Sequence, residues 1–162
     1  MDKQTKDVLL STMDYYEYMY GLPAHILSRI ADIETHGTWI LNSYNSVTGA
    51  KGLMGLKPQL IESVQSAFKT SIDPMHPVEA IKGAAMALKR FLNIFGAWDF
   101  AVMAYAADED GLKKWVAQVK SGEAPAVSRY VSDYVRYTIP QYNRFKKQEN
   151  KYYGSNITNV SG

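Results

Sequence analysis

The chain has 162 residues, 46% of them apolar, with a net charge of +2 and no cysteine. This length and apolar content predict one domain with a buried core, and the absence of low-complexity runs and of internal repeats excludes disordered and array architectures. The lack of cysteine excludes disulfides and thiolate metal sites, and the small net charge gives no support to nucleic acid as a partner.

The two ends of the chain differ in character from its middle. The opening stretch "MDKQTKDVLL" has no apolar core after its charges, so we expect neither a secretory signal nor a membrane span. The last part, from Ala126 onward, is rich in Arg and Lys, which could favour an anionic partner or form a solvated basic face. We predict a folded domain over residues 1–147 and a polar tail over residues 148–162.

In the first half, apolar spacing and helix-stop residues predict three helices. The first covers residues 6–20, with Val8, Leu9, Met13, Tyr16 and Tyr20 near helical spacing and Gly21 as its stop. The second begins with Pro23 in its first turn and ends at Gly37. Residues 38–57 predict an irregular or weakly β segment, and a short helix follows from Pro58 to about Lys69.

The second half is also helical by pattern. A long helix is predicted from Pro77 to Gly96, and residues 97–107 are apolar nearly all round, as in a helix central to a fold. Residues 108–122 and 124–145 predict two more helices, the last interrupted before Pro140. The fold class is therefore mainly α, with one long loop after the second helix.

Glu34 occupies an unusual place at the end of the second predicted helix. It continues the spacing of the apolar residues 26, 27, 30 and 33, so its carboxylate projects at the edge of the core-facing stripe. Desolvation and the negative end of the helix dipole both raise the pKa of a carboxyl group there, which suits a general acid. The same spacing also fits a partly exposed glutamate on a frayed last turn, and spacing alone does not decide.

The loop "SVTGAKGLMGL" places Gly49, Gly52 and Gly55 within seven positions. Such a density suits sharp turns or the close approach of a ligand to the backbone, although any tight loop can show it. The order of motifs along the chain is more informative. It runs from "ET" at Glu34 through "SVTGAKGLMG" at residues 46–55 and "DP" at residues 73–74 to "AYAAD" at residues 104–108.

This ordered set, over roughly residues 20–140, resembles the soluble lytic transglycosylase family of lysozyme-like enzymes, which cut the glycan strands of bacterial cell walls. The resemblance implies a lysozyme-like fold, Glu34 as the catalytic residue and no cofactor or metal. The three histidines have no metal-ligand spacing in any case. The supporting or substrate-binding residues expected from the resemblance and from the aromatic pattern are Thr35, Ser46, Gly52, Met54, Gly55, Tyr105 and Tyr137.

By family analogy, Ser46 and Tyr105 orient Glu34 and Met54 packs at the sugar subsites, while Tyr137 belongs to a Tyr stripe that could stack on sugars or simply pack in the core. Tyr105 equally fits a core tyrosine with a satisfied hydroxyl. Trp39 could be a lid residue or a core residue.

The sequence departs from the family pattern at three positions. Gly55 replaces a Gln that would line the subsites, Ala106 replaces an Asn, and Ala126 lies near the place of a glutamate. We expect these losses to weaken substrate binding, so that restoring Gln at 55 and Asn at 106 lowers KM.

Glycosidases usually need two carboxylates, but Asp32 lies about 200° round the helix from Glu34 and the next acidic residue is Glu62. The resemblance implies a mechanism with one carboxylate. Glu34 protonates the oxygen between MurNAc and GlcNAc and then deprotonates the MurNAc 6-hydroxyl, which closes a 1,6-anhydro ring.

Three functions remain open: this transglycosylase, a lysozyme-type muramidase that uses water, and a non-catalytic wall-binding module of a virion. The expected partner is peptidoglycan, with other virion proteins as further partners. The expected origin is a bacteriophage, and the expected location is the virion or the host periplasm after delivery.

Overall fold

The computed structural model describes residues 1–96, 98–106, 110, 113, 114, 117, 144, 147, 148 and 151. The helices predicted within residues 108–145, the Tyr stripe with Tyr137, Ala126 and the predicted tail lie largely or wholly outside the described residues. The chain divides into two compact units, Met1–Lys89 and Arg90–Gly162, which are described separately. The predicted boundary at residue 147 stays a prediction.

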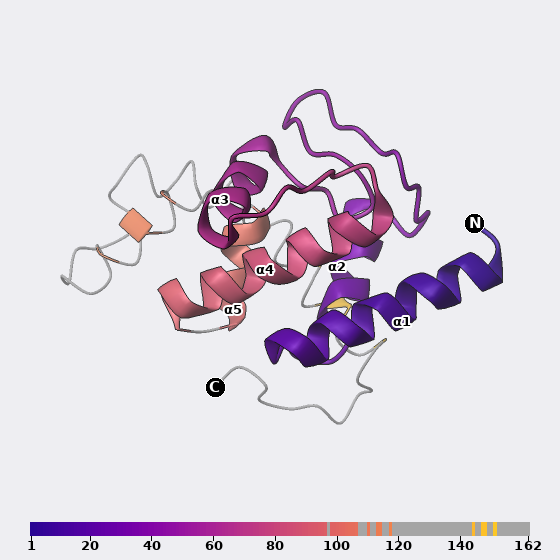
Figure 1. Cartoon of the computed structure of the whole chain (residues 1–162), viewed down its shortest axis with the longest axis horizontal. Helices are drawn as coiled ribbons and strands as arrows, with labels where there is room; N and C mark the ends of the chain where they lie inside the picture. Colours follow the sequence, from indigo (N-terminus) through magenta and orange to yellow (C-terminus); the bar gives the residue numbers. More distant parts are fainter. Residues whose placement is uncertain are drawn as a thin grey trace. The chain divides into compact units, whose positions relative to one another are not determined.

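Five helices account for most of the described residues, which confirms the mainly α class (Figure 1). They are α1 (Lys3–Tyr20), α2 (Ile26–Glu34), α3 (Pro58–Phe68), α4 (Pro77–Phe95) and α5 (Trp98–Ala106). The predicted weakly β segment is also present, as two isolated antiparallel bridges in which Lys51 pairs with Tyr44 and with Leu56. None of the described helices combines the length and the hydropathy needed to cross a bilayer.

Helix α1 begins at Lys3, three residues before its predicted start, and ends at Tyr20 as predicted. The Asp2 carboxylate caps its start by accepting the Thr5 N–H at 2.8 Å, and Gly21 ends it in the left-handed region at φ +64°. Its buried face consists of Leu9, Met13 and Glu17. Val8, which the sequence places near the same helical spacing, lies outside this face, because it is about 100° round the helix from Leu9 and its side chain is 57% exposed.

Helix α2 is shorter than predicted at both ends. It begins at Ile26 rather than near Pro23, because His25 has a left-handed φ of 67°, and the carboxylate of Glu17 on α1 accepts the N–H groups of His25 and Leu27 at this start. It ends at Glu34 rather than at Gly37, because His36 and Gly37 adopt positive φ values of 52° and 77°. Residues 26–31 of α2 are all buried, as are residues 83–88 of α4 in the same unit.

The remaining helices match their predicted limits within one residue. Helix α3 begins at Pro58, and Lys69 is its left-handed cap. Helix α4 carries Gly83, where an added Cβ would lie 3.0 Å from Ile72 and 3.3 Å from Leu56. This close packing joins α4 to the end of the long loop. In the second unit, residues 101–105 of α5 are buried, as their apolar pattern predicts.

Candidate functional site

Glu34 lies at the point where α2 meets the glycine-rich turn. It is the last residue of α2 and is half-buried. A Cβ atom built on Gly55 would lie only 2.6 Å from Glu34 Cδ and 2.7 Å from Glu34 Cγ, so the Glu34 side chain rests directly on the Gly55 backbone. Gly55 is also partly exposed. The structure therefore places a partly accessible carboxylate against a backbone that has no side chain.

The turn beneath Glu34 is held firmly by hydrogen bonds and by burial. The Gly55 N–H donates to the Gly52 carbonyl at 3.2 Å, and Lys51 and Leu56 exchange two N–H···O bonds of 3.0 Å. Leu53, Met54 and Leu56 are all fully buried. Met54, expected at the sugar subsites, therefore contributes its side chain to the core beneath the turn.

The other two glycines of the loop approach the protein's own chain. A Cβ at Gly52 would lie 2.9 Å from the Pro74 carbonyl carbon, and its carbonyl oxygen is closer still. A Cβ at Gly49 would lie 3.2 Å from Pro58 Cδ. Both glycines also have positive φ values. The close backbone approach expected of this loop is thus made to the two proline segments, and the "DP" motif is a direct neighbour of the glycine motif.

Ser46 lies at the exposed tip of the loop. The tip is a compact turn in which the Asn45 side chain accepts the N–H groups of Val47 and Thr48 at 2.9 and 3.2 Å. Asn45 and Ala50 close the turn through a backbone hydrogen bond of 2.9 Å. The expected role of Ser46 in orienting Glu34 stays a prediction.

Thr35 secures the chain directly after Glu34. Its hydroxyl donates to the Ala31 carbonyl at 2.7 Å and accepts the Trp39 N–H at 3.0 Å, and the residue is buried. Two hydrogen bonds to the backbone therefore hold the turn that follows α2. These hydrogen bonds fix the backbone directly after Glu34 to the last turn of α2.

Trp39 is a core residue rather than a lid, because only 3% of its surface is exposed. Its indole N–H donates to the Asp32 carboxylate, and the Lys6 ammonium lies 4.6 Å from its ring centroid. Asp32 thus interacts with Trp39, on the side of α2 that the helical spacing predicts. Of the two acidic residues of α2, Glu34 is the one that contacts the glycine-rich turn.

Glu17 is a buried carboxylate that the sequence analysis did not single out. It accepts the His25 N–H at 3.1 Å and the Leu27 N–H at 2.9 Å, and desolvation raises its pKa above the usual value for glutamate. Its spacing from Leu9 and Met13, at i, i+4 and i+8, could have revealed that it faces the core. Its contacts define it as the cap of α2.

The three histidines of the chain lie in its described part, as do many of its acidic residues. His25, His36 and His76 are all exposed. Throughout the part of the chain that the structure describes, no group of three or more His, Asp or Glu side chains is placed to hold a metal ion.

One expected site residue, Tyr105, and one departure from the family pattern, Ala106, lie on α5 in the second unit. Tyr105 is 3% exposed, and Ala106 is half-buried at the end of the helix. The roles expected of Tyr105 and Tyr137 toward Glu34 and the substrate stay predictions.

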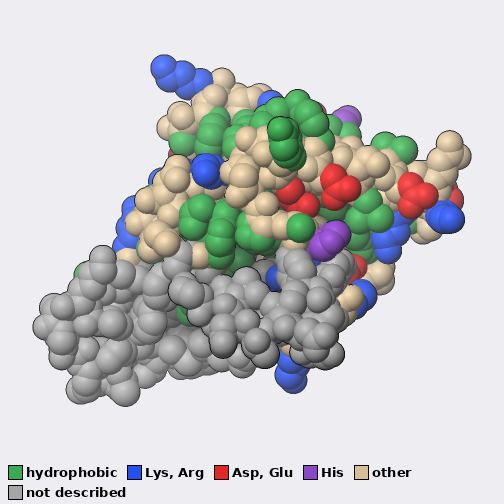
Figure 2. Space-filling model, turned by 90° about the horizontal axis from the view of Figure 1, so that it is seen from below, with side chains coloured by type: hydrophobic (Ala, Val, Ile, Leu, Met, Phe, Trp, Pro, Cys, Tyr) green, Lys and Arg blue, Asp and Glu red, His purple; other side chains and the backbone are tan. Residues whose placement is uncertain are grey.

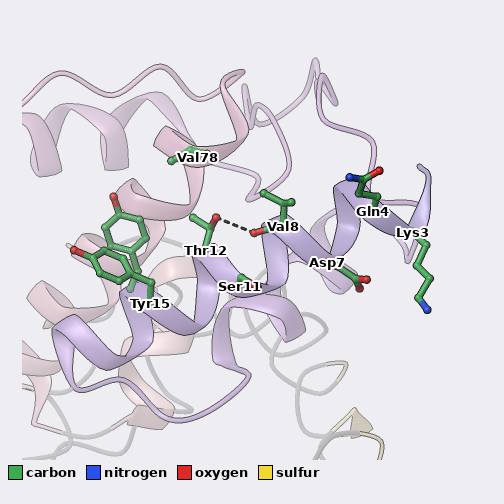
Figure 3. Close-up of a pocket in the computed structure, with 9 residues that line it drawn as sticks. Lys3, Gln4, Asp7, Val8, Ser11, Thr12, Tyr15 and Val78 are labelled. Atoms are coloured by element: carbon green, nitrogen blue, oxygen red, sulfur yellow. Dashed lines mark hydrogen bonds between the residues drawn. The ribbon is translucent and has the colours of Figure 1, made fainter.

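A separate groove of about 850 Å³ runs along the outer face of α1. It is lined by α1 residues from Lys3 to Tyr16 and by Val78 of α4, and the Thr12 hydroxyl in it donates to the Val8 carbonyl at 2.9 Å (Figure 3). Apolar side chains also reach the surface elsewhere, in patches separated by polar and charged groups (Figure 2). Glu34 is not among the residues that line the groove.

A mainly helical fold with a glutamate at a helix end, resting on a glycine-rich turn, is that of a lysozyme-like domain. The family model described as "Transglycosylase SLT domain" matches residues 11–127 of the 162, a span that includes Glu34, the glycine-rich loop and Tyr105. The chain belongs to this family. Membership implies transglycosylase-type cleavage of peptidoglycan, and peptidoglycan as the substrate. No curated protein and no solved structure matches the chain significantly. The bacteriophage origin and the location stay predictions.

Proposed function

We propose that the protein is a lytic transglycosylase that cuts the β-1,4 bond between MurNAc and GlcNAc, with Glu34 as both the acid and the base. The observation that carries this proposal is the contact between Glu34 and Gly55, because it places the carboxylate at the surface of the motif that the family match covers. Family membership supports the type of reaction, and the contact with Gly55 supports Glu34 as the residue that carries it out.

The proposed reaction balances with one carboxyl group. Protonated Glu34 gives its proton to the glycosidic oxygen as the bond from that oxygen to MurNAc C1 breaks. The resulting carboxylate then takes the proton of the MurNAc 6-hydroxyl as its oxygen bonds to C1. Glu34 ends protonated, no water is consumed, and the products are a free GlcNAc 4-hydroxyl and a 1,6-anhydro-MurNAc end.

The position of Asp32 supports this scheme over one with two carboxylates. A nucleophile or a base opposite Glu34 would have to face the same sugar, and a retaining pair has its carboxyl groups about 5 Å apart. Asp32 instead accepts a hydrogen bond from Trp39, and Glu62 is exposed on α3. We therefore favour the intramolecular 6-hydroxyl over water as the attacking group.

Mass spectrometry of digested cell walls tests the proposal. Anhydro-muropeptides are expected, whereas reducing muropeptides would identify a muramidase and the release of neither would identify a wall-binding module.

The first prediction concerns the acid itself. Glu34→Gln keeps the shape of the side chain but cannot donate a proton as a carboxylic acid does, so wall lysis should fall by about 1,000-fold, the middle of the range for general acid–base catalysis. The melting temperature should stay the same or rise, because the substitution removes a carboxylate at the negative end of α2. Turbidity loss of wall suspensions and circular dichroism measure the two effects. Lysis at the parent rate would exclude Glu34 as the acid.

A further inference from the structure

We propose that Gly55 is a positioning residue for Glu34, because the absence of its side chain creates the place in which the catalytic carboxylate lies. This inference deepens the proposed function and, for its catalytic part, rests on it. It also reverses the expectation that Gly55 marks a gap in the substrate-binding shell. The space next to Gly55 is already filled by Glu34.

The distances leave no room for both groups. A Cβ on Gly55 would lie 2.6 Å from Glu34 Cδ and 2.7 Å from Glu34 Cγ, whereas real Cβ atoms essentially never come within 3.0 Å of a neighbour. The backbone angle φ of Gly55 is +58°, which most side chains disfavour as well. The present position of Glu34 and any side chain at residue 55 therefore exclude each other.

Of the two partners, Glu34 is the one that must move. The turn backbone is held by the paired hydrogen bonds of Lys51 and Leu56 and by the buried Leu53 and Met54. Gly52 closes it from the other side, against the Pro74 carbonyl. The Glu34 carboxyl group is the far end of a flexible side chain and can turn away. A methyl group at residue 55 thus acts on the acid rather than on the loop.

Displacing the acid should change the chemical step more than substrate binding. A shift of about 1 Å in a catalytic group can cost about 100-fold in rate. The substrate contacts made by the rest of the domain are not altered by a methyl group at residue 55. The expected signature is therefore a loss in kcat with KM nearly unchanged, and Gly55→Gln should share it instead of lowering KM.

A stability cycle tests the steric relation without using activity. Gly55→Ala is made in the parent and in Glu34→Ala, where the obstructing side chain is absent. The loss in Tm should be larger in the parent by at least about 3 °C. In a chain of this length, that difference corresponds to an interaction free energy of about 1 kcal/mol between the two residues. Gly21→Ala is the matched control, because Gly21 has φ +64° with nothing within 4 Å of its Cβ position. The loss in Tm caused by Gly21→Ala should be the same in the parent and in Glu34→Ala. If Gly55→Ala also causes the same loss in both proteins, the proposal is overturned.

Kinetics on cell walls test the positioning role. Gly55→Ala should lower kcat at least about 10-fold, change KM by less than about 3-fold and shift the alkaline limb of the pH profile, along which the proposed acid loses its proton, while Gly21→Ala leaves all three as in the parent. A parent-like kcat and pH profile in Gly55→Ala would overturn the positioning role even if the Tm values are coupled. If the parent chain releases no muropeptides, the proposed function and the positioning role of Gly55 in catalysis are overturned. The steric exclusion between residue 55 and Glu34 still holds in that case if the loss in Tm is larger in the parent than in Glu34→Ala.

Discussion

At the scale of single residues, the three loop glycines lie against neighbouring groups that differ in how easily they can move away from an added side chain. Gly49 faces the ring of Pro58, Gly52 faces the backbone carbonyl of Pro74, and Gly55 faces the flexible side chain of Glu34. A carbonyl in the backbone can yield only if the chain moves, whereas a carboxylate can rotate. The same substitution to alanine should thus damage the fold at residue 52 and the proposed active site at residue 55.

The prediction for Gly52 follows from this difference. Gly52→Ala should lower the free energy of unfolding by roughly 3 kcal/mol, the sum of about 1 kcal/mol for the positive φ and about 2 kcal/mol for the displaced backbone. Gly21→Ala has the φ term alone and should cost about 1 kcal/mol. Urea denaturation measures both values. Equal values would contradict the close approach to Pro74 and would return Gly52 to the role of a ligand-facing glycine.

At the scale of elements, most helix limits marked by a local glycine or proline were predictable, and the start of α2, which depends on a distant residue, was not. Gly21, Pro58, Pro77 and Gly96 mark helix ends that agree with the structure within one residue. The start of α2 was placed too early, because Pro23 resembles a first-turn proline while the actual cap comes from Glu17, eight residues before His25. The contact between Glu34 and Gly55 likewise joins residues 21 positions apart, which no local pattern encodes.

Glu17 therefore links α1 to α2, and replacing it should lower the free energy of unfolding. Glu17→Gln keeps one acceptor oxygen for two buried N–H groups and places an amide N–H₂ near the other, so we expect a loss of about 1–3 kcal/mol. Thermal or urea unfolding measures it. Wall binding and kcat should change little, since Glu17 interacts with backbone groups of α2 rather than with the proposed site.

The pH dependence of the same variant gives an independent test. Because desolvation raises the folded-state pKa of Glu17, the folded protein binds more protons than the unfolded chain between the unfolded and folded values. The contribution of Glu17 to stability is therefore fully present below its unfolded pKa and decreases as pH rises through its folded pKa. The difference in Tm between the parent and Glu17→Gln should shrink between about pH 4 and neutrality. A difference that grows with pH would reverse the sign of the assigned pKa shift.

At the scale of the whole molecule, a net charge of +2 conceals a basic excess toward the C-terminus. Attraction to an anionic cell wall should add to the binding of intact walls, and salt should screen it. Lysis of whole walls should therefore fall as ionic strength rises from about 0.01 M to 0.15 M, where the Debye length shortens from about 30 Å to 8 Å.

A charge-neutralised variant isolates this effect. Lys146→Gln, Lys147→Gln and Lys151→Gln together remove three positive charges, which changes the net charge from +2 to −1. Its lysis should depend less on salt than that of the parent, while cleavage of short neutral glycans should be nearly salt-independent in both. The same salt slope for the parent and the variant would exclude the basic segment as the source.

The exclusion between a side chain at residue 55 and the present position of Glu34 also limits the order in which substitutions can accumulate in this chain. A single change from Gly to Gln would meet an acid that already occupies the space, so the two sites form an epistatic pair. A chain with a glutamine at this position has to hold Glu34 elsewhere, because the carboxyl group can lie on the turn only when residue 55 has no side chain. Substitutions that relocate Glu34, such as changes in the turn after α2, should therefore precede any change to glutamine along an adaptive path.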